Sequence, residues 1–137
     1  MAYSIFKGPI ELPSPIMVEG EAQESMTPGH IIDSEFAVGD ATTIGQLLIL
    51  RDGGQGKGEG IDYAYANGDY VSAYKARQGL IFAVRAATGV ALVKGVTLLE
   101  RGASGRLTIL DEGVAVAVAD ETVTTTANDQ LVQVEIL

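Results

Sequence analysis

The chain has 137 residues, of which 47% are hydrophobic, and a formal net charge of −9. This length suits one domain with a sizeable core, and the absence of cysteine excludes disulfides, thiolate metal sites and cysteine nucleophiles. The acidic balance argues against nucleic acid as a partner, because phosphates are bound by lysine and arginine. The chain shows neither an apolar run of membrane-spanning length nor a basic start followed by a hydrophobic stretch. We therefore expect a soluble protein with no membrane partner and no secretory signal.

The charges are unevenly distributed along the chain. Residues 1–50 hold seven acids and one base (−6), residues 51–110 hold eight bases and five acids (+3), and residues 111–137 hold six acids (−6), which together give −9. One interpretation is a set of solvated loops and strand faces. The other is that acidic segments dock on a basic partner while the middle segment presents its arginines and lysines elsewhere.

Residues 1–28 are predicted to form an extended arm, because they hold all four prolines of the chain. Proline has no amide donor and favours extended geometry in the residue before it, so helices and central strands are disfavoured here. The segment is nevertheless too apolar for a free tail. It is expected to form either an extended arm that lies along its own barrel or on a neighbouring subunit, or a short edge strand on its own core.

Residues 29–137 are predicted to form a small single-domain β-barrel or a jelly-roll-like sandwich. Short β-branched and apolar runs recur about every ten residues with glycine-containing turns between them, which is typical of all-β folds. The predicted strands are His30–Asp33, Gln46–Leu50, Tyr70–Ala76, Leu80–Ala86, Val96–Glu100, Leu107–Leu110, Val114–Ala119 and Leu131–Ile136.

The motifs that suggest chemistry each fail on detail. In the glycine-rich loop 52–60, Gly56-Lys57 is followed by glycine instead of the hydroxyl residue that a P-loop requires. Acidic residues around that loop match no calcium-binding spacing. His30 is the only histidine, so any serine–histidine–aspartate relay would have to use it, and its apolar setting favours a structural role. We predict no catalytic residue, no cofactor and no metal.

Several segments of residues 26–137 follow one another in a characteristic order of turns and strands. They are Met26–Ile32, Gly56–Tyr65, Tyr65–Val71, the apolar strand that Gly79 opens, Lys94–Glu100, Gly105–Leu107, Val114–Asp120 and Leu131–Leu137. In order and spacing they resemble a family of small tailed-phage capsid decoration, or head-cement, proteins. At the second turn the chain has Gly95-Val96 where the family pattern has Gly-Asp. This departure affects the stability of the turn and not the resemblance.

The resemblance implies a non-enzymatic protein that binds the outer surface of the expanded capsid and cements neighbouring major capsid protein subunits as a dimer or trimer. Its location would be the outer surface of the virion, after assembly in the host cytoplasm. An alternative is a β-barrel component of a phage tail or baseplate. The candidate capsid contacts are apolar residues of the arm and basic residues of the middle segment: Ile10, Leu12, Ile16, Met17, Arg51, Lys57, Lys75, Arg77 and Arg85.

Overall fold

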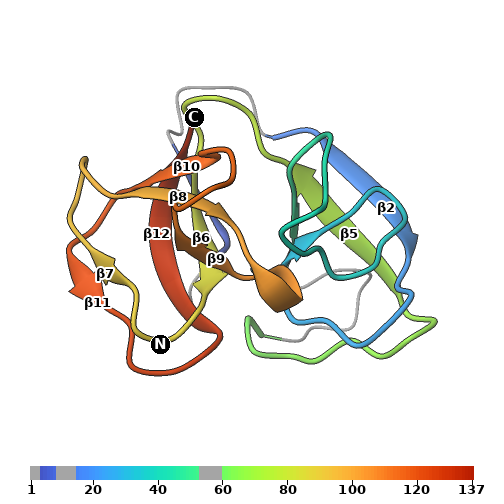
Figure 1. The fold of residues 1–137 in the computed structure, drawn as a ribbon. Coiled ribbons are helices and arrows are strands. Elements are labelled where there is room, and N and C mark those ends of the chain that lie inside the picture. Colours follow the sequence, from blue (N-terminus) through green and yellow to red (C-terminus); the bar gives the residue numbers. More distant parts are fainter. Residues whose placement is uncertain (1–3, 9–14, 53–59) are drawn as a thin grey trace.

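The computed structural model describes residues 4–8, 15–52 and 60–137, which form short strands and one 3-10 helix (Figure 1). The helix η2 covers Ala103–Gly105. The strands are β1 (Phe6–Gly8), β2 (Met17–Glu21), β3 (Ile31–Ile32), β4 (Leu48–Leu50), β5 (Tyr70–Lys75), β6 (Ile81–Ala86), β7 (Ala91–Leu92), β8 (Leu98–Arg101), β9 (Leu107–Ile109), β10 (Ala117–Ala119), β11 (Val123–Thr124) and β12 (Gln130–Ile136). The predicted all-β class is confirmed.

Five strands close into a barrel in the order β6-β12-β10-β8-β9. Neighbouring strands are antiparallel, and a parallel bridge between Ala86 of β6 and Leu107 of β9 completes the ring. The longest pairing joins β6 to β12, from Ala86 opposite Gln130 to Ile81 opposite Glu135. Of the two predicted architectures, the structure therefore shows the barrel. Closure matters because it removes the open strand edges that a flat sheet would expose.

Alternating residues of β12 fill the barrel interior. Val132, Val134 and Ile136 are buried, while the residues between them are more exposed, as expected for a strand with one face on the core. β6 differs, because five of its six residues are buried. Residues of a second sheet pack against it: the ring centroids of Tyr74 in β5 and Phe82 in β6 lie 5.5 Å apart.

The second sheet has four strands in the order β2-β5-β4-β3, and it has an apolar layer on each face. Ile31 and Ile49 belong to the cluster that also contains the barrel core. Ile32, Leu48, Leu50, Val71 and Ala73 instead pack against loop residues, which include Met26, Phe36 and Tyr65. The sheet is thus enclosed between the barrel and a layer of loops. We call the sheet and its loop layer the sheet lobe; it lies to the right of the barrel in Figure 1.

The described parts of residues 1–28 are strands on the chain's own sheets. Ile5 is fully buried, and β1 pairs with β6. β2 pairs with β5 over five residue pairs and is the outermost strand of its sheet. Ala22 and Met26 are buried in the loop layer. The described residues of this segment thus lie on the chain's own sheets, with β2 as an edge strand.

Candidate functional site

Four of the predicted contact residues lie together at the outer edge of the sheet lobe. Ile16 accepts a hydrogen bond at its backbone oxygen from the backbone N–H of Lys75 (2.8 Å), and Met17 lies opposite Tyr74. The side chains of Ile16 and Met17 are both 47% exposed. Arg77 follows two residues after Lys75 and is exposed. We call Ile16, Met17, Lys75 and Arg77 the contact face; it combines exposed apolar surface with two positive charges.

Arg85, the fifth basic candidate, lies inside the protein. It is only 6% exposed, and its guanidinium donates hydrogen bonds to the backbone oxygens of Pro28, Ile61 and Asp129 and to the carboxylate of Asp62. These groups come from loops far apart in the chain. Arg85 therefore holds loops of the sheet lobe against the barrel, and the expectation that it contacts a partner is corrected.

The remaining candidates are dispersed or lie outside the described residues. Arg51 follows β4 and donates its backbone N–H to Ser72, which places it three residues along β5 from Lys75. Ile10, Leu12 and Lys57 lie outside the described residues, so their predicted contacts stay predictions.

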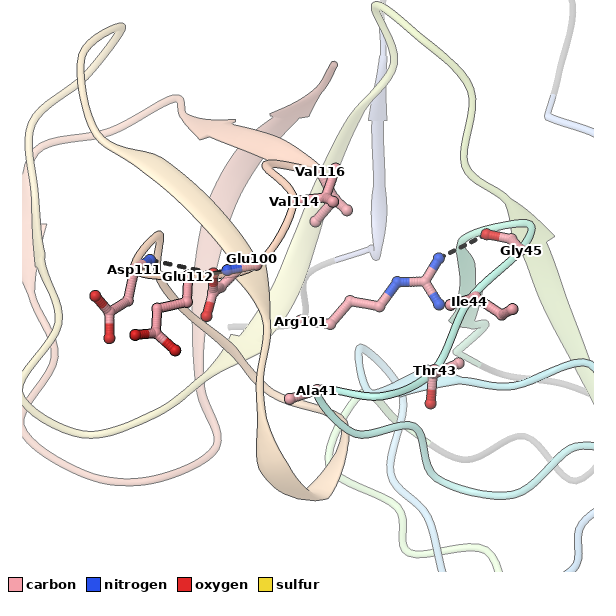
Figure 2. A pocket seen from close by; sticks show the side chains of 11 residues that line it. Ala41, Thr43, Ile44, Gly45, Glu100, Arg101, Asp111, Glu112, Val114 and Val116 are labelled. Carbon is pink, nitrogen blue, oxygen red and sulfur yellow. Dashed lines mark hydrogen bonds between the residues drawn. The ribbon is translucent and has the colours of Figure 1, made fainter.

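A pocket of about 640 Å³ lies between the barrel and the sheet lobe (Figure 2). Its walls come from loop 41–45, the end of β8 and segment 111–116. Two aliphatic residues at its rim are unusually exposed: Ile44 at 90% and Val114 at 79%. The carboxylates of Asp111 and Glu112 lie on the barrel side of the pocket. We call this feature the interlobe pocket.

Arg101 reaches across the interlobe pocket from the barrel to the sheet lobe. Its Nη2 donates to the backbone oxygen of Gly45 at 2.7 Å, whereas its Nη1 is buried and has no hydrogen-bond partner. Burial lowers the pKa of this guanidinium, because little surrounds it to replace water. A buried guanidinium with an unpaired N–H group destabilises the fold, and a hydrogen-bond acceptor that reached it would offset this cost.

The main polar cluster among the described residues joins His30, Asp129 and Arg106. His30 Nδ1 accepts the backbone N–H of Thr27 (3.1 Å), so the neutral ring carries its proton on Nε2 and donates it to Asp129 (2.8 Å). Arg106 donates two further bonds to the same carboxylate. The bond from Arg106, with the help of His30, lowers the pKa of Asp129 to about 2, and burial lowers the pKa of His30.

This cluster connects loops, and its hydrogen bonds leave no ring nitrogen of His30 free to act as a base. Both ring nitrogens of His30 are engaged within the chain, so neither is available to activate a hydroxyl. Among the described residues, no group of three or more histidine, aspartate or glutamate side chains is arranged to hold a metal ion. The described parts of the chain also contain no helix long and apolar enough to cross a membrane.

Comparison with known proteins adds no relative to this picture. No protein-family model matches the chain, and no curated protein sequence matches it.

The interlobe pocket is not predicted from the sequence, although one signal for it is present there. Ile44 is the only large aliphatic residue among the small and polar residues of 41–45, and a loop of that kind gives it no core to enter. Val114 was placed in a predicted strand, but β10 begins at Ala117, so Val114 is left on a loop. Arg101 gives no local signal, because its partnership with Gly45 spans 56 positions of sequence.

Proposed function

We propose that the chain is a structural virion protein that binds the outer surface of the expanded phage capsid and cements neighbouring major capsid protein subunits, acting as a dimer or trimer. The observation that carries the proposal is the contact face. Ile16 and Met17 are each about half exposed at the outer edge of the sheet lobe, with their side chains on opposite sides of the strand, and Lys75 pairs with Ile16. Exposed apolar side chains grouped beside charges are typical of surfaces that become buried in an assembly.

The electrostatics of the contact face favour a defined orientation on the shell. The chain carries −9 overall, yet the contact face holds Lys75 and Arg77. Two basic side chains at one edge of an otherwise acidic protein, beside Glu19 and Glu21 of β2, favour an acidic part of a partner at that edge. Orientation is a requirement for a cement protein, because each copy must meet the shell with the same face.

The rigid barrel also suits this role. Many copies on one shell act together, so modest binding by each copy adds up to substantial reinforcement of a head under internal pressure. A closed barrel presents few strand edges to neighbouring copies, which limits uncontrolled aggregation at high local concentration. The engagement of both His30 nitrogens within the chain is consistent with a non-enzymatic role.

Substitutions on the contact face test the proposal. The variant Ile16→Ser/Met17→Ser should co-sediment with expanded, undecorated heads with an apparent affinity lower on the order of tenfold, because two aliphatic side chains lose their buried area. Val96→Ser is the matched control, since Val96 is an aliphatic residue that is 69% exposed on the turn before β8. It should bind as the original chain does.

The outcomes separate the alternatives. Absence of binding by the folded original chain would overturn capsid decoration and favour the tail or baseplate alternative. Equal binding by the serine variant and the original would remove the contact face from the proposal. Deletion of residues 1–25 is a poorer test, because it also removes buried Ile5 and the whole of β2.

A further inference from the structure

The interlobe pocket carries opposite charges on its two sides, and they do not meet. Asp111 and Glu112 are exposed on the barrel side, and the guanidinium of Arg101 points toward loop 41–45 on the other side (Figure 2). No salt bridge joins Arg101 to either acid in the described structure. The aliphatic side chains of Val114 and Val116 lie between the two sides.

Glu100 does not neutralise Arg101, although it is the preceding residue. Successive residues of a strand point to opposite faces, and the Glu100 carboxylate accepts the backbone N–H groups of Asp111 (3.1 Å) and Gly113 (2.7 Å). Those bonds fix the turn that presents Asp111 and Glu112. The chain therefore holds a cation and two exposed carboxylates at fixed positions on either side of an apolar centre.

We infer that the interlobe pocket is a self-association surface, on which a second copy of this chain docks about a two-fold axis so that Asp111 and Glu112 of each copy face Arg101 of the other. A two-fold axis brings the same patch together from both copies, so that the positive side of one lies against the negative side of the other. Ile44 and Val114, exposed at 90% and 79%, would be covered at the centre of this interface.

The second copy is favoured over other occupants because the patch is complementary to itself. Each copy holds a guanidinium with one unpartnered nitrogen on one side of the pocket and exposed carboxylates on the other, and a two-fold rotation reverses that order. Nη1 of Arg101 is shielded in the single chain, so pairing requires its side chain to rotate toward the pocket, where Arg101 already forms part of the wall. The bonds formed to carboxylates would replace the one to Gly45.

Net charge sets a condition on this association. Two copies at −9 repel each other at long range, and salt screens this repulsion strongly. Salt screens the attraction between paired, partly buried charges in the interface much less. Dimerisation should therefore strengthen when ionic strength rises from about 0.01 M to about 0.15 M, since the Debye length falls from about 30 Å to about 8 Å. This inference rests on the self-association part of the proposed function and not on capsid binding.

Sedimentation equilibrium of the isolated full chain, with charge reversals, tests the inference. The original chain should dimerise, and both Arg101→Glu and Asp111→Arg/Glu112→Arg should weaken the dimer at least about thirtyfold, because like charges then face each other. An equimolar mixture of the two variants should dimerise again. In the mixed dimer, the glutamate introduced at position 101 of the first copy faces the arginines introduced at positions 111 and 112 of the second. The unchanged Arg101 of the second copy faces the unchanged Asp111 and Glu112 of the first. Lys94→Glu, an exposed reversal on the turn before β8, is the charge-matched control.

Each result decides between alternatives. A monomeric original chain, a dimer indifferent to both reversals, or a mixture that stays monomeric would overturn the inference. If Arg101→Glu does not fold by circular dichroism, the exposed Asp111→Arg/Glu112→Arg variant still decides it, and Asp111→Arg/Glu112→Arg/Arg101→Gln should not restore association. The test requires no capsid, so its failure is separate from failure of head binding.

Discussion

The barrel and the sheet lobe bury their apolar residues in different ways. The barrel closes on itself, and its centre is filled mainly by aliphatic side chains that alternate along strands such as β12. The sheet lobe has an open sheet, so its second face is covered by loops that carry the larger side chains of Met26, Phe36 and Tyr65. Tyr65 is fully buried and makes an edge-to-face contact with Tyr63 at 5.0 Å between ring centroids.

This difference shows where the fold depends on individual hydrogen bonds. A closed barrel satisfies its backbone groups through pairing with neighbouring strands, whereas loops need separate partners for theirs. The loop layer obtains such partners from the barrel: the guanidinium of Arg85 in β6 donates hydrogen bonds to the backbone oxygens of Pro28 and Ile61. The two regions also share one core cluster, so we expect them to unfold together.

The largest expected effect is in the barrel core. Phe82 is fully buried and packs against the rings of Phe6 and Tyr74 at 5.5 Å each. Phe82→Ala should lower the free energy of unfolding by about 3–5 kcal/mol through lost burial and the cavity left behind. Phe82→Leu, which keeps most of the volume, should cost about 1 kcal/mol. Urea denaturation followed by circular dichroism and tyrosine fluorescence measures both, and two separate transitions would contradict the shared core.

The next effect tests the connection between the two regions. Arg85→Met retains the aliphatic stem but leaves the carbonyl groups of Pro28, Ile61 and Asp129 without their donor. The free energy of unfolding should fall by about 2–4 kcal/mol, because buried acceptors lose their partners. Arg77→Met, at an exposed position, should change it by less than about 0.5 kcal/mol. Equal effects of the two substitutions in urea denaturation would show that Arg85 is dispensable.

A smaller effect is expected where the loop layer meets the outermost strand. A Cβ atom at Gly20 would lie 2.7 Å from Cδ1 of Phe36, so Gly20→Ala should displace that ring and cost about 1–3 kcal/mol. Gly60→Ala is the control, because a Cβ there meets nothing within 4 Å. Thermal unfolding compares them, and a Gly20→Ala variant as stable as the control would show that the contact with Phe36 adjusts freely.

The smallest expected effect is on the pH dependence of the free energy of unfolding, through the ionisation of Asp129. The pKa of Asp129 is lowered to about 2 from 3.8, so its contribution is complete above about pH 5 and is lost as the pH falls toward 2. Because its side chain is 40% exposed, we expect only about 1 kcal/mol at pH 7 after solvent screening. Asp129→Asn should remove this amount at pH 7 and have progressively less effect at pH 4 and pH 3.

The asparagine substitution is suitable because residue 129 has a φ of +66°, a conformation that asparagine tolerates. Glu35→Gln, on an exposed turn, is the control and should change stability by less than about 0.5 kcal/mol at every pH. Urea denaturation series at pH 7, 4 and 3 measure both variants. A destabilisation by Asp129→Asn that stays constant with pH would contradict the ionic role of this carboxylate.

Much of the fold could be predicted from local pattern. Alternation, apolar runs and glycine-containing turns identified β5, β6, β9 and β12 closely, because these patterns are properties of consecutive residues. The two-residue strands β7 and β11 were missed, since neither is long enough to show a period. β2 was predicted only within one of two forms of the arm, because the prolines around it disfavour a central strand.

The site was less predictable, for a physical reason. The basic residues of the middle segment were treated alike, yet Arg85 is buried and Arg77 is exposed. The difference depends on carbonyl groups at positions 28, 61 and 129, which only the folded chain brings together. The same holds for the interlobe pocket, whose walls come from three distant segments.

The most direct test of the central claim is electron microscopy of expanded, undecorated heads saturated with the purified chain. Capsid decoration predicts extra density at fixed lattice points on the outer surface, bridging neighbouring capsid subunits, with the contact face toward the shell. Heads without added density, in the presence of folded protein, would contradict the account.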